Sequence, residues 1–348
     1  MMRLWRRRRE GSLDFTITAV NPLDHAEGIK QLFRDHERPE FPAFFDRAYA
    51  AGVRGGGVSW IGRDGAGHIV MHVACFPQRF QFGEREVVGG LMVNALVARP
   101  FRSFFPAHAL IKRAKKDTAA RGDIDFIYTD PNNQAKAVMD ACGFVKVGSL
   151  TRYVLAVSDR RWLVDGAIRL LHAGVQVVSR SRRGIGLVAH PATEFSPACF
   201  EAPSGASPRL RAYHEPARYT ARLETYPNVL DWWFTHQGNG DGGAIAAGLL
   251  VRGPDPAGVA ILHAIRRDAG LPLGALMPGL VAALRGKGCT WLQIWTLAES
   301  QFADELRRLG FVAREDAAPI VATGLTPTGQ AVLQAAPLWE ITSLDCDR

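Results

Sequence analysis

Few cysteines and no long apolar run are present, and each absence excludes a class of protein. Five cysteines are scattered over 348 residues without a Cys-x-x-Cys pair, so the sequence predicts neither a zinc site nor a disulfide framework. No apolar stretch approaches the ~20 residues that a membrane-spanning helix needs. These absences favour a protein of a reducing compartment, and we expect a cytoplasmic location and no metal centre.

Charge and length narrow the classes further without choosing one. The net charge is +8, hydrophobic residues make up 47% and charged residues 22%, which is ordinary for a globular protein. The length favours about two domains. An excess of positive charge suits a nucleic acid, an anionic membrane or a phosphorylated cofactor, and composition alone does not decide among them.

Two basic segments lie outside the expected domains. Residues 1–14 contain the run Arg6-Arg7-Arg8-Arg9 without the apolar core of an export signal, so we expect a solvated tail, with attraction to an anionic surface as the alternative. Residues 158–208 are expected to form a basic amphipathic helix at 160–183 and then a linker. That helix either bridges the two domains or makes a peripheral membrane contact.

The periodicity of apolar residues predicts one α/β unit in residues 15–157. The expected order is β-α-α-β-β-β-α-β-α-β, a mixed sheet with helices on its faces. In that order, the expected elements are Phe15–Val20, Ala26–Asp35, Glu40–Ala50, Val58–Ile61, His68–Phe76, Val87–Val97, Phe105–Arg121, Ile124–Tyr128, Asn133–Ala141 and Phe144–Val157.

A second unit in residues 209–348 repeats much of this order. Hairpin, helix, strand and helix recur, and each series ends in a Gly-Phe pair, at Gly143-Phe144 and at Gly310-Phe311. Internal duplication is the simplest explanation. The expected helices are Ala217–Arg222, Pro227–Thr235, Leu273–Arg285 and Ser300–Leu309, and the expected strands are Ala244–Arg252, Gly258–Arg266 and Trp291–Thr296.

The segment from Leu96 to Phe144 is the most informative about function. A strand runs into a turn containing Arg102 and then into a helix. The first N–H groups of a helix lack internal partners, and with a nearby guanidinium they can hold a pyrophosphate. The strand before the turn can pair with an extended chain that carries amides. A ligand with both features is an acyl-coenzyme A.

This segment resembles the core of the GNAT superfamily of acyl-CoA-dependent N-acyltransferases. Members carry Arg or Gln, two free positions, Gly, one free position, and then Gly or Ala. Arg102, Phe105 and Ala107 stand at those three places, with Phe105 where the family has glycine. A second family spacing follows downstream, and it is matched by Asn132, Ala135, Met139, Gly143 and Phe144, with Met139 where many members have tyrosine.

The resemblance implies two tandem GNAT-like domains, of which the second is degenerate because it lacks the Arg-containing loop. It also implies that acetyl-CoA or another acyl-CoA is the co-substrate. The residues expected to bind it are Leu96, Val97, Ala98, Arg102, Ser103, Phe104, Phe105, Ala107 and Asn132.

A general base must take a proton from the attacking amine. Asn94 stands on the strand that often carries this base in the family, and an amide cannot accept the proton. The catalytic candidates are His72, Asp130 and Tyr128. For His72 the alternative is a hydrogen-bonded core histidine, and for Asp130 it is a turn or cap residue.

The predicted function is acyl transfer, with acetyl as the expected group, to a primary amine such as an amino sugar. No specific nucleic acid is expected as a partner. Two alternatives stay open: a FemAB-like transferase that uses aminoacyl-tRNA, and a non-catalytic binding protein on a degenerate GNAT fold.

Overall fold

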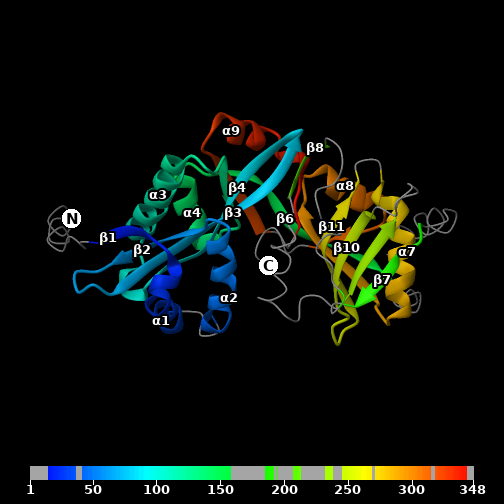
Figure 1. Ribbon diagram of the computed structural model, residues 1–348, viewed down its shortest axis with the longest axis horizontal. Helices are drawn as coiled ribbons and strands as arrows, with labels where there is room; N and C mark the ends of the chain where they lie inside the picture. The colour runs from blue at the N-terminus through cyan, green and yellow to red at the C-terminus, as the bar shows by residue number, and fades with distance from the viewer. Residues whose placement is uncertain are drawn as a thin grey trace, which may run out of the picture.

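The computed structural model describes residues 15–36, 41–157, 185–191, 194, 207–212, 232–237, 245–268, 271–314 and 318–342. Strands from these ranges form one mixed sheet that passes through two lobes lying side by side (Figure 1). The basic tail, the expected helix at 160–183 and the expected helix Ala217–Arg222 lie outside the described residues. Among the helices that are described, none is long and apolar enough to cross a membrane.

The first lobe follows the predicted order of elements, which confirms a mixed α/β fold. Its elements are β1 (Thr16–Val20), η1 (Pro22–His25), α1 (Ala26–His36), α2 (Phe41–Arg54), β2 (Val58–Arg63), β3 (Ile69–Gly83), β4 (Arg85–Val97), η2 (Arg99–Phe101), α3 (Phe104–Arg121), β5 (Phe126–Thr129), α4 (Asn133–Ala141) and β6 (Val145–Ala156). Strand β3 is longer than expected because its hairpin with β4 continues as far as Gly83, which turns with φ 63°.

Helices cover both faces of the first-lobe sheet, with α1 and α2 on one side and α3 and α4 on the other (Figure 1). Phe41, Phe45 and Tyr49 follow one another at four-residue spacing on α2, and all three are fully buried. That spacing places them on one helical stripe facing the core. On the opposite face, the indole nitrogen of Trp60 donates to Asp117 on α3 over 3.0 Å.

The second lobe contains β7 (Val188–Pro191), β9 (Trp232–Gln237), β10 (Ile245–Arg252), β11 (Val259–Arg267), α7 (Leu273–Gly286), β12 (Trp291–Leu297), α8 (Gln301–Arg308) and β13 (Val312–Ala313). The linker expected at 158–208 contains β7 and the start of β8 (Ser207–Ala212). Strand β8 pairs with β3 and with β15 (Trp339–Glu340), and its Arg209 forms an ion pair with Glu305 of α8.

The helix expected at Pro227–Thr235 is wrong where the structure describes it, because Trp232 begins strand β9. This strand pairs with β10 on one side and β7 on the other. Trp233 stacks on His190 of β7, while Phe234 is buried in the core under α7. A short apolar run fits a strand covered on both faces as well as it fits a helix, and bulky aromatic side chains favour the strand.

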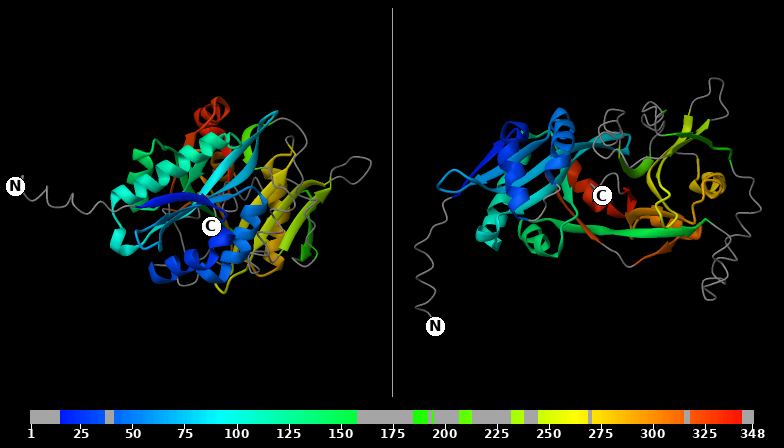
Figure 2. Two further views of the ribbon diagram at one scale, coloured as in Figure 1. Left: turned by 60° about the vertical axis from the view of Figure 1, so that its left-hand side comes forward. Right: turned by 90° about the horizontal axis from the view of Figure 1, so that it is seen from below.

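The two lobes exchange strands. Strand β14 (Ala318–Gly324), from the end of the chain, lies between β5 and β6 of the first lobe. The far end of β6 lies between β12 and β13 of the second lobe. The right-hand view of Figure 2 shows β6 running from one lobe into the other. The domain boundaries expected from the sequence stay a prediction, and these pairings show that strands cross them.

Asp125, just before β5, fastens the returning C-terminal segment to the first lobe. Its carbonyl oxygen accepts from the backbone nitrogens of Leu325 and Thr326, at 2.7 and 3.1 Å. Its carboxylate accepts from the Thr326 hydroxyl at 2.8 Å and from the Val88 backbone nitrogen at 2.9 Å. Helix α9 (Pro327–Gln334) starts here, and a Cβ on Gly329 would lie 1.8 Å from the Asp125 carbonyl oxygen.

We predict that Gly329→Ala destabilises the protein by about 2 kcal/mol or more, because the new methyl group must push helix α9 away from Asp125. Denaturant unfolding of the full chain measures the change. Gly286→Ala is the matched control, since Gly286 is also a helical glycine, at the end of α7, and a Cβ there meets nothing within 4 Å. A Gly329→Ala variant as stable as the control would contradict the close docking of α9.

Candidate active site

Strands β4 and β5 separate part-way along their length. They pair in parallel at Gly89↔Phe126, Gly90↔Ile127 and Leu91↔Tyr128. Strand β4 then continues to Val97 on the β3 ladder alone, and within the described ranges no strand pairs with it on the β5 side beyond Leu91. Backbone N–H and C=O groups on that side of β4 can therefore pair with an extended ligand.

A β-bulge interrupts β4 beside this opening. The ladder with β3 passes from the pair Ala74↔Val93 to the pair His72↔Leu96, so Asn94 and Ala95 together lie opposite Val73. Asn94 has φ 54°, which is the left-handed region. Asparagine tolerates that region better than most residues with a side chain, because it can hydrogen-bond locally. The bulge therefore has a residue suited to it.

A buried polar network holds the bulge from the side of α1 and α2. The His72 ring is fully buried, with Nδ1 2.9 Å from the Asn94 carbonyl oxygen and Nε2 3.2 Å from the Ser59 hydroxyl. The Asn94 side-chain nitrogen donates to the Tyr49 hydroxyl over 3.1 Å. A carbonyl oxygen only accepts, so Nδ1 of His72 carries the proton and the Ser59 hydroxyl donates to Nε2.

This placement argues against His72 as the general base. Burial lowers the pKa of His72 to about 4, and the hydrogen bond to Asn94 offsets only part of that effect. The ring is therefore neutral at physiological pH, and both of its nitrogens already have partners. The catalytic assignment made from the sequence stays a prediction, and the geometry favours a structural task for this ring.

The neutral His72 makes stability depend on pH. A histidine with a pKa near 6.5 when unfolded and about 4 when folded contributes stability above pH ~6.5 that is lost as the pH falls toward 4, amounting to about 3 kcal/mol. We expect His72→Asn to flatten this part of the profile of unfolding free energy against pH. Exposed His68 supplies the control, because His68→Asn should keep the wild-type slope.

The turn after β4 leads through η2 into α3. The Arg102 guanidinium is exposed and donates to the Val97 carbonyl oxygen, with Nε at 3.3 Å and Nη2 at 3.2 Å. Helix α3 begins after Ser103, which makes no side-chain cap. Pro106 has no N–H, so the outward-facing donors of the first turn come from Ser103, Phe104 and Phe105. The Phe105 ring is 79% exposed and points into solvent.

The other predicted site residues are spread over the lobe. The Tyr128 hydroxyl is buried and donates to Gln78, away from solvent. Asp130 is half-buried after the end of β5. The Asn132 side-chain oxygen caps α4 by accepting from the Ala135 nitrogen at 2.9 Å, and Met139 is buried. Leu96, Val97 and Ala98 do lie together with Arg102–Ala107 at the end of β4, and their roles stay predictions.

In the second lobe the helix that corresponds to α3 is α7, and its first backbone N–H already has a side-chain partner. Glu305 on α8 accepts from the Leu273 nitrogen, the first of α7, at 3.1 Å, and forms a two-point ion pair with Arg267 at 3.1 and 2.7 Å. Arg209 of β8 joins Glu305 to Glu340 of β15. Burial raises the pKa of Glu305, but hydrogen bonds and the charge of Arg267 outweigh it and hold the pKa below its usual value.

This ionic cluster could not be predicted from the sequence. Arg209, Arg267, Glu305 and Glu340 come from four separate elements, and no local spacing connects them. Their arrangement supports the expectation that the second lobe does not hold a cofactor, because a protein carboxylate already occupies the start of α7. The start of α3 has no such carboxylate among the side chains that the structure describes.

We predict that Glu305→Ala destabilises the protein by about 3 kcal/mol, because Arg267 would be left buried without its main partner. Thermal or denaturant unfolding measures this. Asp304→Ala is the matched control, since Asp304 is the preceding residue and forms an exposed pair with Arg307. A loss no larger than that of the control would show that the cluster does not stabilise the second lobe.

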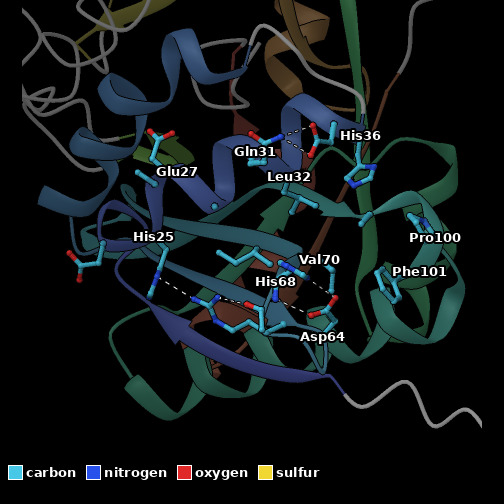
Figure 3. Close-up of a pocket in the computed structure, with 18 of the residues that line it drawn as sticks. His25, Glu27, Gln31, Leu32, His36, Asp64, His68, Val70, Pro100 and Phe101 are labelled. Atoms are coloured by element: carbon cyan, nitrogen blue, oxygen red, sulfur yellow. Dashed lines mark hydrogen bonds and ion pairs between the residues drawn. The ribbon is translucent and has the colours of Figure 1, made fainter.

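A pocket of about 730 Å³ lies between α1, the β2–β3 turn and η2 (Figure 3). It is on the side of the β4–α3 turn that faces away from β5. Arg63 reaches His25 at 3.4 Å across its base, and Gln31 donates to Asp35 on its α1 wall. Val70 and Phe101 also line it, whereas His72 and Asn94 do not. The pocket is therefore separate from the bulge.

Solved structures share the fold of this chain. A GCN5-related N-acetyltransferase from Anabaena variabilis superposes with a TM-score of 0.64 at 11% identity, covering 91% of this chain and 74% of that one. A probable N-acyltransferase from Enterococcus faecalis gives 0.60 at 10% identity, with the same coverage. The chain has the GNAT fold. No protein-family model and no curated protein matches the sequence, so this likeness concerns the fold.

A third GNAT-fold structure is the glucosamine N-acetyltransferase region of a fungal multi-domain β-N-acetylglucosaminidase. Its TM-score is 0.52 at 12% identity, and the match covers 90% of this chain and 38% of that one. In the GNAT fold of the present chain, the opening, the bulge and the uncapped α3 all belong to the first lobe.

Proposed function

We propose that the first lobe binds an acyl-CoA and transfers its acyl group, acetyl in the simplest case, to a primary amine. The observation that carries this proposal is the separation of β4 from β5 beyond Leu91, with a bulge at Asn94 and a direct continuation into the start of α3. The GNAT fold supports it, because proteins described as an N-acetyltransferase and a probable N-acyltransferase share this fold.

The residues at the opening fit the chemical groups of an acyl-CoA. The free side of β4 offers backbone donors and acceptors to the amides of its extended arm. Arg102 and the outward N–H groups of Ser103, Phe104 and Phe105 suit its diphosphate. When bound, the thioester supplies an activated acyl group. The exposed Phe105 ring points into solvent, so it leaves the backbone of the α3 start accessible.

The protein must also remove a proton from the amine. Asp130 is the best-placed of the predicted bases, because it follows the end of β5 at the opening and is half-buried. The Tyr128 hydroxyl is buried and donates to Gln78, and the Met139 thioether has no proton to donate, so neither presents an acid to the opening in this structure. Protonation of the departing thiolate is therefore assigned to solvent.

An amino sugar is the proposed class of acceptor, and the cytoplasm the proposed location. The support for the acceptor is the glucosamine N-acetyltransferase region, which is named for such a substrate and has the same fold. Primary amines of amino sugars are ammonium ions at neutral pH, so a carboxylate such as Asp130 suits both their binding and their deprotonation.

Calorimetry with acetyl-CoA tests the proposal. We expect one binding site per chain, because only the first lobe leaves its helix start open within the described residues. Arg102→Ala should weaken binding about tenfold, through loss of one charge-assisted contact to phosphate. Arg85→Ala is the matched control, since Arg85 is an exposed arginine at the β3–β4 hairpin.

The same titration separates the alternatives. Absence of acetyl-CoA binding by the intact chain, together with tight binding of tRNA, would favour the FemAB-like transferase. Binding of neither would favour a non-catalytic role. Acetyl-CoA affinity that Arg102→Ala leaves unchanged would show that the turn is not the diphosphate site.

A further inference from the structure

The proposed function places a thioester carbonyl beside β4, and the following inference rests on that function. Polarising this carbonyl takes an N–H group whose direction is set before the substrate arrives. The peptide unit between Asn94 and Ala95 lies in the bulge, outside the ladder with β3. We propose that His72 is a positioning residue that holds and polarises this peptide unit for acyl transfer.

The geometry of one peptide connects His72 to the opening. The Asn94 carbonyl and the Ala95 N–H belong to the same planar trans peptide, so they point in opposite directions. The His72 Nδ1–H donates to the Asn94 oxygen over 2.9 Å. Fixing that oxygen therefore directs the Ala95 N–H away from the buried ring.

The strand pattern places the Ala95 N–H on the open side of β4. The Ala98 nitrogen donates to the Val70 carbonyl, so residue 98 faces β3. Backbone groups alternate sides along a strand, which turns those of Ala95 and Val97 away from β3. The contact from Arg102 to the Val97 carbonyl agrees with this direction. Ala95 is also exposed, unlike its neighbours Val93 and Leu96.

Hydrogen bonds in series strengthen this donor. The Ser59 hydroxyl donates to Nε2 of His72, and Nδ1 of the same ring donates to the Asn94 carbonyl. Each bond polarises the next, so the Ala95 N–H becomes a stronger donor than an ordinary strand amide. The neutral ring supplies this polarisation without placing a charge in the core.

Packing keeps the ring and the bulge in one arrangement. Phe33 meets the His72 ring edge-on, with centroids 5.6 Å apart, and Tyr49 lies at 5.8 Å. Tyr49 also accepts from the Asn94 side chain. Both the main chain and the side chain of Asn94 are thereby tied to the same buried group of residues, so the bulge is held from two directions.

Isotope-edited infrared spectroscopy of [1-13C]acetyl-CoA bound to the full chain tests the proposal without an acceptor amine. Polarisation lowers the carbonyl stretching frequency relative to free acetyl-CoA. We expect this shift in the wild-type protein, and loss of most of it in His72→Leu, with acetyl-CoA affinity within about twofold because the other contacts remain.

Two conservative variants guard against misfolding of His72→Leu. Asparagine can place an amide N–H near the Nδ1 position, so His72→Asn should keep the shift of the carbonyl frequency. Glutamine places its amide near the Nε2 position instead, so His72→Gln should lose that shift. His68→Asn is the control. An equal shift in the wild type, His72→Leu and His72→Gln would overturn the role of His72. Failure of the wild-type protein to bind acetyl-CoA would instead overturn the proposed function.

Discussion

The backbone ladder of β14 is the interaction on which the architecture depends. Strands β5 and β6 do not pair with each other in this structure, and β14 fills the space between them with hydrogen bonds to both. Buried backbone groups must be paired, so the first lobe is complete only when this C-terminal strand is in place. Strand β6 does the same for the second lobe between β12 and β13. The two lobes are therefore thermodynamically linked, although their sequences read as successive units.

The two lobes share the same order of secondary-structure elements but differ at the start of the helix that follows the hairpin. In the first, β4 leaves β5, and the helix that follows starts without a side-chain cap. In the second, β11 pairs with β12 only as far as Leu262↔Ile294, and the helix that follows is capped by Glu305. Thr342 donates to the His263 carbonyl on the same stretch of β11. The protein's own polar groups thus take positions in the second lobe that stay open in the first lobe among the described residues.

Elements with a strong local pattern were predictable from the sequence. The apolar run of β4 and the apolar spacing in α3 gave both elements nearly their observed bounds. Strand β9 was missed because a run of three aromatic residues carries no clear period. Strand β14 was missed because its place depends on partners at Phe126–Thr129 and Val145–Leu150, which are distant in the sequence.

The part of the candidate site that lies in one continuous segment was predictable from the sequence. The part that depends on contacts between residues distant in the sequence was not. Leu96 to Ala107 form one continuous segment, so a motif could find it. The structural task of His72 depends on a bulge at Asn94, and no residue type predicts that bulge. The ionic cluster around Glu305 joins residues from four separate elements. Burial of the His72 ring argues against a base and for a structural ring, and burial follows from the tertiary fold.

The strand exchange also has a consequence in time. A ribosome releases the N-terminal part of a chain first, and domains ordinarily fold as they emerge. Here Phe126 of β5 pairs with Gly324 of β14, and Lys146 of β6 pairs with Val321 of β14. The first lobe therefore cannot close its sheet until translation has almost reached the end of the described residues. Until then β5 and β6 present unpaired edges that could join other chains. Nascent chains of this protein would therefore depend on chaperone shielding more than a single lobe of the same size would.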